Sequence, residues 1–284
     1  MKSKWYLIMV SLILLFISTV GCSFTKEEYN LLNDPRWKLV WSDEFDGKTI
    51  DRSKWNFQIG NNNGWGNNEW QYYTDGKNAW IENGMLVIEA RKEIVKDSKG
   101  TYQYTSTRMT TENKFTVQYG KIEARIKFPY GKGLWPAFWM LGENFRYVGW
   151  PMCGEIDIVE FLGHDKKTVY GTLHGPGYSG TYGIGGRYML DITTQPSFVD
   201  DFHIFGVVWD EDKLIWYVDN VIYHAVYRSS IESKGKVWVF DNPFFIILNL
   251  AVGGNWPGYP DYTTPFPVKM YVDYVRVYKL QGND

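Results

Sequence analysis

The sequence is poor in cysteine and histidine and has almost no net charge. Only two cysteines, Cys22 and Cys153, occur in 284 residues, which rules out a disulfide-rich scaffold and leaves the hydrophobic core to hold the fold. The four histidines, at positions 164, 174, 203 and 224, show neither HxxH nor HExxH spacing, which argues against a zinc site. With 30 basic and 32 acidic side chains the net charge is −2, so we expect no nucleic-acid partner.

Long hydrophobic runs are missing too, apart from one at the N-terminus. There Lys2 and Lys4 precede an apolar stretch from Trp5 to Phe16, which is typical of an export signal rather than a membrane span. We therefore expect residues 1–21 to be a signal peptide. Cys22 follows small residues and resembles the lipid-modified cysteine of bacterial lipoproteins; cleavage by the ordinary signal peptidase is the alternative. Residues 22–34 then form a lipidated, polar tether, and residues 35–284 form the domain.

Convincing amphipathic helical patterns are absent after residue 35, and hydrophobic residues alternate instead. From Lys121 to Phe128, for example, Ile122, Ala124 and Ile126 share one face, as in a half-buried strand. Similar runs occur at Met85 to Ala90, Phe202 to Trp209, Phe244 to Leu250 and Lys269 to Tyr278, and Asp219-Asn220 predicts a hairpin between two further strands. A dozen or more strands without an internal repeat predict one all-β domain, a jelly-roll sandwich of two antiparallel sheets.

Aromatic side chains are abundant, with 14 Trp, 21 Tyr and 16 Phe making up 18% of the sequence. A core of this size needs fewer, so some rings are expected to face a ligand. Flat rings with a polar edge suit the CH-rich faces of sugars, although an aromatic-rich sandwich core is the alternative and composition does not choose between them.

The segment GEIDIVEF contains three carboxylates, Glu155, Asp157 and Glu160, within six residues that otherwise have the pattern of a strand. Strict alternation puts Glu155 and Asp157 on one face but turns Glu160 into the core, where an unpaired carboxylate is costly. A β-bulge around Ile158 and Val159 restores all three acids to one face. We therefore predict a bulge at this point.

With this bulge, Glu155 and Glu160 stand roughly 13 Å apart at their Cα atoms, at about 3.3 Å per residue. Side chains leaning inward then bring the carboxyl groups to about 5–5.5 Å, the spacing of a retaining glycosidase. Asp157 is placed to hydrogen-bond Glu155 and, through its charge, to help hold a proton on a neighbour. An exposed acidic strand and a hard-cation site are the alternatives, although cation sites more often draw their ligands from a loop.

The extended segment WPMCGEIDIVEF closely resembles the active-site strand of family 16 glycoside hydrolases, in the laminarinase-like branch with the motif E-x-D-x-x-E. Further segments match in the expected order: Trp41 to Gly47, Gly64 to Glu69, Tyr72 to Thr74, Trp135 to Trp139, His174 to Tyr178 and Gly253 to Gly258. The resemblance implies a curved jelly roll with substrate along a concave cleft, and endo-hydrolysis of a β-glucan with retention. By position, Glu155 resembles the nucleophile, Glu160 the general acid/base and Asp157 the residue that supports the nucleophile.

The same resemblance implies six substrate-binding residues: Asn61, Arg108, Trp135, Trp139, His174 and Trp256. Alternation places Trp135 and Trp139 on one strand face, where they stack on sugar rings unless they pack in the core. Arg108 matches an arginine near the substrate, with a surface ion pair as the alternative. His174 matches a histidine beside the acid/base, and Trp256 lies in a Gly/Pro loop at the expected cleft rim.

No catalytic cofactor is implied, but the resemblance does imply a structural calcium ion held by Glu44, the Gly84 carbonyl and Asp273. Because Asp273 alternates with Val275 on a strand face, we expect a buried carboxylate whose partner is calcium or simply a lysine or arginine. Cys153 adjoins the acidic segment, where no neighbouring base would activate it, so we expect a packed thiol.

Three functions fit these residues. The first is an endo-acting β-glucanase that cuts β-1,3-glucan (laminarin) or mixed-linkage β-1,3-1,4-glucan. The second is a non-catalytic glycan-binding surface lipoprotein, whose signature would be loss of either glutamate. The third is a relative acting on a galactan such as agarose or carrageenan, which a net charge of −2 does not favour for sulfated polymers. We predict the first, as an exported, monomeric cell-surface or periplasmic bacterial lipoprotein that meets the membrane only through its lipid.

Overall fold

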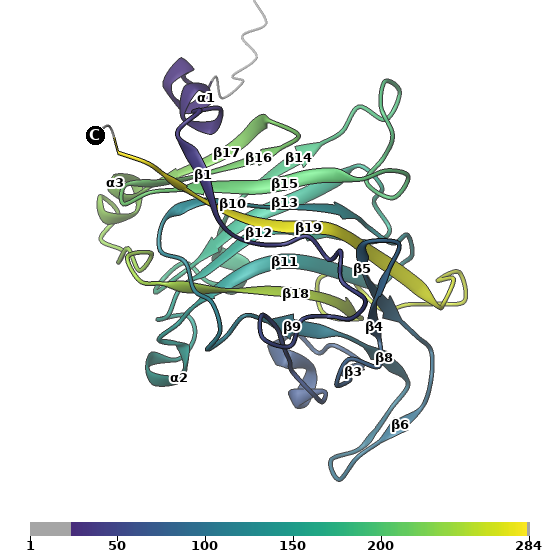
Figure 1. Cartoon of the computed structure of the whole chain (residues 1–284). Helices are drawn as coiled ribbons and strands as arrows, with labels where there is room; N and C mark the ends of the chain where they lie inside the picture. Colours follow the sequence, from purple (N-terminus) through teal and green to yellow (C-terminus); the bar gives the residue numbers. More distant parts are fainter. Residues whose placement is uncertain (1–23, 283–284) are drawn as a thin grey trace, which may run out of the picture.

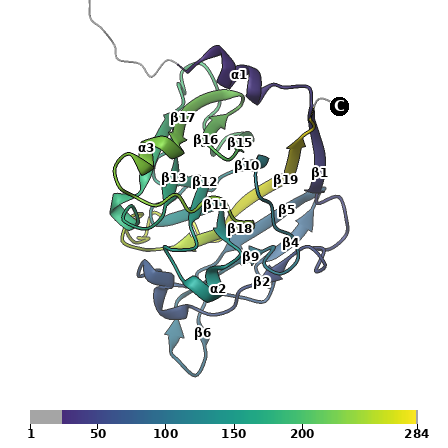
Figure 2. The same cartoon turned by 90° about the vertical axis from the view of Figure 1, so that its left-hand side faces the viewer.

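Two antiparallel sheets stacked face to face form the body of the protein (Figure 1). The structure, a computed structural model, describes residues 24–282, so the predicted signal peptide at 1–21 and the predicted lipidation site Cys22 lie outside the described residues. Figure 2 shows the short helix α1 above the sheets and α2 in the lower part of the molecule, with the segment labelled β6 extending below it. The predicted jelly-roll sandwich is confirmed.

The larger sheet has eight strands. Its order is β17 (Val221–Tyr227), β16 (Lys213–Val218), β15 (His203–Trp209), β10 (Gly120–Lys127), β19 (Val268–Leu280), β5 (Met85–Ala90) and β4 (Ala79–Glu82), with β1 (Trp37–Asp43) paired to β19 as well. Strands that are far apart in the sequence lie side by side in this sheet; β10, for example, pairs with β19.

The smaller sheet has seven strands and contains the acidic segment. Its order is β14 (Ile184–Met189), β13 (Thr168–His174), β12 (Glu155–Phe161), β11 (Leu134–Gly142), β18 (Phe244–Val252), β9 (Arg108–Thr110) and β2 (Asn56–Phe57). The acidic strand β12 therefore lies inside the sheet, between β11 and β13.

Shorter elements surround the two sheets. They are the parallel pair β3 (Gln71–Tyr73) and β8 (Tyr104–Ser106), the hairpin β6 (Val95–Lys96) and β7 (Thr101–Tyr102), the helices α1 (Lys26–Leu32), α2 (Phe145–Val148) and α3 (Arg228–Glu232), and the 3₁₀ turns η1 (Asn62–Gly66) and η2 (Gly180–Tyr182). Within residues 24–282, no helix has the length and apolar character needed to cross a membrane.

Period-two alternation determines which faces are buried. In β10, Ile122, Ala124 and Ile126 are fully buried, as the alternation predicted. The hairpin between β16 and β17 turns at Asp219 and Asn220, whose φ angles of 48° and 68° are the left-handed values that a two-residue hairpin requires.

The core between the sheets absorbs many of the aromatic side chains. Trp55, Trp209, Trp216, Phe138 and Phe161 are each at most 1% exposed. Burial of a large apolar side chain contributes about 1.5–3 kcal/mol, so these rings are a main source of stability. Many of the aromatic side chains are therefore part of the core. The tryptophans outside this cluster are the ones that could contact a ligand.

Residues 26–32 form a helix, so the prediction of a polar tether is wrong for this part of residues 22–34. Thr25 caps α1, and its side chain and that of Glu28 complete a capping box. Leu32 is 2% exposed and packs against Val208 and Ile215 on the outer face of the larger sheet. The helix was missed because seven residues are too few to show a helical stripe.

Candidate active site

Strand β12 contains the predicted bulge. Asp157 pairs with Trp139 of β11 and Val159 pairs with Phe138, so Ile158 has no counterpart on that strand. The same shift appears against β13, between Asp157 and Glu160. The extra residue shifts the pairing register by one position, so the side chains after it point to the other face. The predicted bulge is confirmed.

The bulge separates apolar from acidic side chains. Ile156, Ile158 and Val159 belong to the core between the sheets and are at most 1% exposed. Asp157 and Glu160 are turned to the opposite face of the same strand, yet they remain only 2% and 8% exposed. Three carboxyl groups, including that of Glu155, therefore meet in a site with little water.

Two neighbouring strands supply the contacts of these acids. The indole Nε1 of Trp135 on β11 donates a hydrogen bond of 3.1 Å to Oε1 of Glu160. On β13, His174 pairs with Glu155, and its Nε2 lies 3.2 Å from Oδ2 of Asp157 and 3.9 Å from Oε1 of Glu155. His174 is thus closest to Asp157 and Glu155, whereas the resemblance had placed it beside the acid/base Glu160.

Burial raises the pKa of all three carboxyl groups. For Glu160, desolvation is the largest cause and the charges of Asp157 and Glu155 add to it, so its pKa lies well above the ordinary value. Desolvation and the charge of Asp157 also raise the pKa of Glu155, while His174 and a hydrogen bond from Trp150 lower it. A carboxyl group that keeps its proton near neutral pH is suited to act as a general acid.

Trp150 is a site residue that the sequence reasoning did not single out. It precedes the acidic segment and its side chain lowers the pKa of Glu155, while 45% of the residue remains exposed. Its ring centroid lies 6.1 Å from that of His174. The only signal was its position next to the motif.

Arg108 lies between two tryptophan rings. Its guanidinium carbon is 4.6 Å from the ring centroid of Trp65 and 4.7 Å from that of Trp139, both within cation–π range. The residue is 9% exposed and its Nε has no hydrogen-bond partner among the described residues. The alternative of a surface ion pair is wrong, because Arg108 is a buried residue held between two rings.

Trp139 is held by a polar network that the sequence reasoning missed. Its Nε1 donates to Oδ1 of Asn249 at 2.7 Å, and Asn249 donates to the hydroxyl of Tyr73 at 3.2 Å. Tyr73 in turn contacts Glu69, whose pKa is raised by burial. A lone asparagine within the nine-residue apolar strand FFIILNLAV was the signal that could have identified Asn249.

The side chain of Asn61 supports a loop. Its Nδ2 donates to the carbonyls of Glu69 and Gln71 at 3.0 and 2.9 Å, and its Oδ1 accepts from the amide of Gly64 at 2.9 Å. These bonds use both ends of the amide. Asn61 therefore holds η1 and Trp65 in place, and it also lines the polar cavity beside them, so its contact with substrate stays a prediction.

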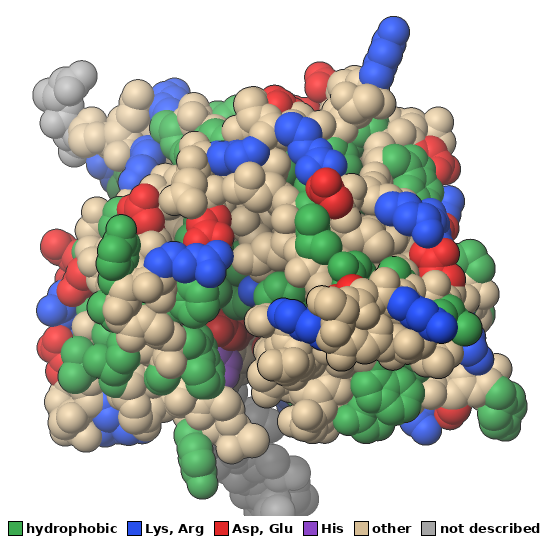
Figure 3. All heavy atoms as spheres, turned by 90° about the horizontal axis from the view of Figure 1, so that it is seen from below, with side chains coloured by type: hydrophobic (Ala, Val, Ile, Leu, Met, Phe, Trp, Pro, Cys, Tyr) green, Lys and Arg blue, Asp and Glu red, His purple; other side chains and the backbone are tan. Residues whose placement is uncertain are grey.

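Trp256 lies at the rim, as predicted, with 43% of its surface exposed. It meets Trp135 edge-on at 5.7 Å and Tyr170 at 4.9 Å between ring centroids. These rings make an aromatic wall on the Glu160 side of the cluster. Figure 3 shows this lower face of the molecule hollowed near its centre, with acidic and histidine side chains inside the hollow.

The residues expected to hold calcium do not fit a cation in this structure. Arg276 binds Glu44 through two nitrogens, the shorter contact being 2.7 Å, and Arg125 binds Asp273 at 2.8 Å. The side chain of Asp273 is 34% exposed, so the prediction of a buried carboxylate is wrong. The cause is a second bulge: Arg125 pairs with Tyr274 and the next residue of β10 with Val272, which skips Asp273.

Cys153 is a packed thiol, as predicted. It is fully buried beside Leu141, Phe245 and Ile247, and burial raises its pKa to about 11. A thiol with so high a pKa stays protonated and is a poor nucleophile.

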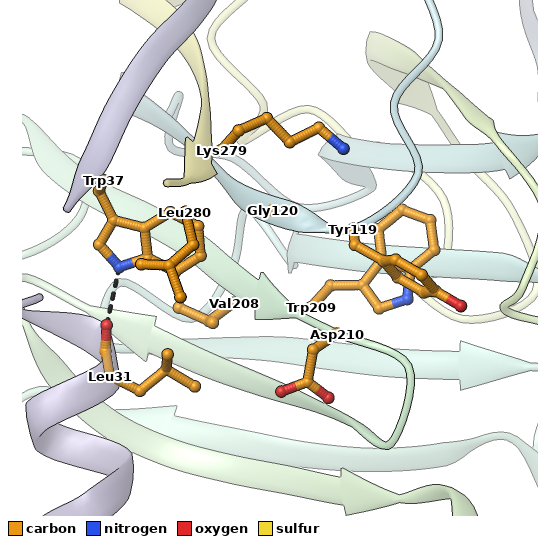
Figure 4. A pocket seen from close by; sticks show the side chains of 9 residues that line it. All are labelled: Leu31, Trp37, Tyr119, Gly120, Val208, Trp209, Asp210, Lys279 and Leu280. Atoms are coloured by element: carbon orange, nitrogen blue, oxygen red, sulfur yellow. Dashed lines mark hydrogen bonds between the residues drawn. The ribbon is translucent and has the colours of Figure 1, made fainter. Parts of the chain in front are cut away.

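Two cavities lie away from the carboxylates. The larger cavity, of about 350 Å³, is polar and begins at Trp65, which stacks on one side of Arg108 while Trp139 stacks on the other. It is lined by Gln58, Ile59, Gly60, Asn61, Asn62, Trp65, Tyr72, Asp97, Lys99 and Arg146. The smaller, about 180 Å³, lies beside α1 on the larger sheet, where Trp37 donates to the Leu31 carbonyl at 2.7 Å (Figure 4). Only the larger adjoins the site.

Two glutamates on one face of a sandwich strand, flanked by tryptophans, are typical of a glycoside hydrolase site. The profile of glycosyl hydrolases family 16 matches residues 66–276. The solved laminarinase catalytic domain from Thermotoga maritima is 61% identical, with a TM-score of 0.85, and the match covers 87% of this chain and 99% of that one. The chain belongs to family 16 of the glycoside hydrolases.

Two curated relatives differ in how much of their length is matched. The β-glucanase of Rhodothermus marinus is 38% identical over 269 residues, which cover 92% of this chain and 91% of that protein. The clotting factor G alpha subunit of Tachypleus tridentatus is 41% identical over 249 residues, but the match spans only 35% of its length and 87% of this chain.

Proposed function

We propose that this chain is an endo-acting, retaining β-glucanase that hydrolyses β-1,3-glucan, mixed-linkage β-1,3-1,4-glucan or both. The observation that carries the proposal is the bulge at Ile158, which turns Glu155 and Glu160 to one face of β12 beside Asp157. The names laminarinase and β-glucanase of the two relatives matched over nearly their whole length support a glucan as the substrate.

The proposed reaction is a double displacement. In the first step, a carboxylate oxygen of Glu155 attacks the anomeric carbon, the bond to the bridging oxygen breaks, and Glu160 donates its proton to that oxygen. In the second step, ionised Glu160 takes a proton from water, whose oxygen attacks the anomeric carbon and releases Glu155. Two inversions at one carbon retain its configuration.

The surrounding residues have positioning roles in this proposal. The hydrogen bond from Trp135 holds Oε1 of Glu160 in place, and the aromatic wall formed with Trp256 offers ring faces and edges to sugar units. On the other side, Arg108 lies between the rings of Trp65 and Trp139 and keeps its positive charge within the site.

The test compares wild type with Glu155→Ala and Glu160→Ala on laminarin, barley β-glucan, agarose and an activated aryl glycoside. Wild type is expected to release reducing ends from one or both glucans. Azide is expected to rescue Glu155→Ala with the inverted glycosyl azide as product, and Glu160→Ala with the retained one. The reverse pattern would exchange the two roles, and a wild type that binds glucan without cutting it would favour a binding protein instead.

We further propose that the protein is exported and lipidated at Cys22. Only Ser23 and Phe24 separate this cysteine from the α1 cap at Thr25, and α1 packs on the outer face of the larger sheet. A lipid at Cys22 would therefore hold the domain with its active-site face turned away from the membrane. Labelling with an alkyne fatty acid in a bacterial host tests this: wild type is expected to incorporate label and Cys22→Ala to be released, whereas equal labelling would contradict the site.

A further inference from the structure

A compact group of metal-ligating atoms lies inside the active site. One atom each of Glu155, Asp157 and His174 falls within 4.8 Å of the others. Glu155 and Asp157 come from β12 and His174 from the end of β13, so the group is assembled across two strands. No spacing within the sequence could have indicated it, which is why the histidine pattern argued against zinc.

Asp157 supplies a second and independent observation. It is 2% exposed, and its Oδ2 accepts no hydrogen bond from residues 24–282 although Nε2 of His174 lies 3.2 Å away. The ring N–H is therefore not directed at this oxygen. A buried carboxylate oxygen without a donor is costly, and a cation would satisfy it.

The distances suit a small divalent ion. Zinc bonds of about 2.0–2.2 Å in tetrahedral geometry place two ligand atoms about 3.3 Å apart. The separation of Oδ2 of Asp157 from Nε2 of His174 already meets this value, at 3.2 Å. The contact of Glu155 with Nε2 is longer, at 3.9 Å, and all the ligand atoms lie within 4.8 Å of one another, so Glu155 must move toward a bound ion.

We infer that Zn²⁺ or a similar transition-metal ion binds Glu155, Asp157 and His174 and inhibits the enzyme. Two carboxylates and one imidazole leave a fourth position open, and a nitrogen ligand favours zinc over calcium and magnesium. Bound metal would occupy the carboxylate proposed as the nucleophile. Inhibition would then be competitive with substrate and reversed by a chelator.

The affinity is expected to be moderate. Nδ1 of His174 is buried and has no hydrogen-bond partner among the described residues, whereas strong sites fix the second ring nitrogen with an acceptor. Lack of such a contact typically weakens metal binding by about 10–100-fold. The site is therefore a reversible inhibitory one and not a structural centre.

The experiment uses two histidine variants, His174→Gln and the exposed His164→Gln as a matched control. Laminarin hydrolysis is titrated with ZnCl₂, CaCl₂ and MgCl₂ in a non-chelating buffer. Zn²⁺ is expected to inhibit wild type and His164→Gln equally, with recovery in EDTA. Relative to its own metal-free rate, His174→Gln is expected to need at least about tenfold more Zn²⁺.

Calorimetry separates this inference from the proposed hydrolase function, because Zn²⁺ binding is measured without turnover. Wild type is expected to bind one Zn²⁺ ion, and Asp157→Asn and His174→Gln to bind it more weakly, with circular dichroism confirming that both variants fold. An unchanged Zn²⁺ affinity in both variants would overturn the inference, as would equal inhibition of wild type by Ca²⁺, Mg²⁺ and Zn²⁺.

Discussion

Strands β12 and β19 each contain one extra residue relative to a neighbouring strand, and each thereby turns a carboxylate out of the core. In β12 the extra residue is Ile158, and Glu160 faces two other acids while only 8% exposed. In β19 the extra residue is Asp273 itself, which is 34% exposed and bound to Arg125 at 2.8 Å. The same kind of β-bulge thus places two carboxylates in very different environments.

The difference lies in the surroundings. On β12, desolvation and the charges of Asp157 and Glu155 raise the pKa of Glu160, so the group can hold and release a proton under working conditions. On β19, an arginine and solvent neutralise the charge of Asp273, and such a pair contributes about 0–1 kcal/mol. A bulge places a side chain, and burial and neighbouring charges decide whether it is reactive.

The largest effect is expected from removing the reactive carboxyl group. Glu160→Gln should lower kcat/KM on laminarin by about 10²–10⁴-fold, the usual contribution of a general acid/base. Asp273→Asn, the matched change on the other bulge, should leave kcat/KM unchanged. Initial rates with purified variants check both, and thermal unfolding confirms that each is folded. Comparable losses in the two variants would mean that the β12 site has no special chemistry.

Deleting the extra residue of β12 tests the parity argument directly. Without Ile158 the strand reads EIDVEF, so strict alternation keeps all three acids on one face. Deletion of Ile156 instead turns Asp157 into the core, where an unpaired carboxylate is costly. The first variant should fold, with stability lowered by about 2–5 kcal/mol for the lost buried side chain, and the second should be largely insoluble.

Urea unfolding and soluble yield measure this difference, and activity gives a second readout. The variant lacking Ile158 should retain more activity than Glu160→Gln, since its acids keep their face. If both deletion variants were equally soluble, or equally insoluble, strand parity would not be what places the acids.

Much of the fold follows from alternation in the sequence. The strands β5, β10, β15, β18 and β19 fall close to their predicted bounds because one face of each must be buried. The bulge of β12 could be predicted because it resolved a conflict between parity and charge. The bulge of β19 was not predicted, because the conflict created by Asp273 alternating with Val275 was resolved by expecting a cation or basic partner instead, and the partner Arg125 is distant in sequence.

The candidate site was predictable only in part for a similar reason. Residues within one segment, such as Glu155 and Glu160, obey local geometry. Contacts between residues that are distant in sequence cannot be predicted from local geometry. Only the structure shows that Arg108 lies between two tryptophan rings and that Asn61 donates hydrogen bonds to main-chain carbonyls. Helix α1 was missed because its stability comes from packing on the larger sheet.

A smaller effect is expected on the pH dependence. The charge of Asp157 raises the pKa values of both Glu155 and Glu160, so Asp157→Asn should lower both. The acid limb of kcat/KM reports ionisation of the nucleophile and the alkaline limb reports loss of the acid's proton. Both limbs should therefore move to lower pH, along with a fall in maximal rate. Asp273→Asn should leave the profile in place, and movement of the Asp157→Asn profile to higher pH would contradict this assignment.

The smallest effect is expected from removing divalent ions. It concerns Asp273 on β19 and Glu44, which directly follows β1. Because Glu44 and Asp273 are neutralised by Arg276 and Arg125, EDTA should leave the melting temperature unchanged. Arg125→Ala should lower stability by no more than about 1 kcal/mol, since the pair is partly exposed.

A melting temperature that falls in EDTA and recovers with CaCl₂ but not with ZnCl₂ would reverse this reading. It would mean that both arginines swing aside for calcium, and that the bulge of β19, like that of β12, presents a carboxylate to a ligand. The Arg125→Ala variant sharpens this outcome, because loss of the competing guanidinium should strengthen calcium binding if the ion uses Asp273 and should have no effect if it does not.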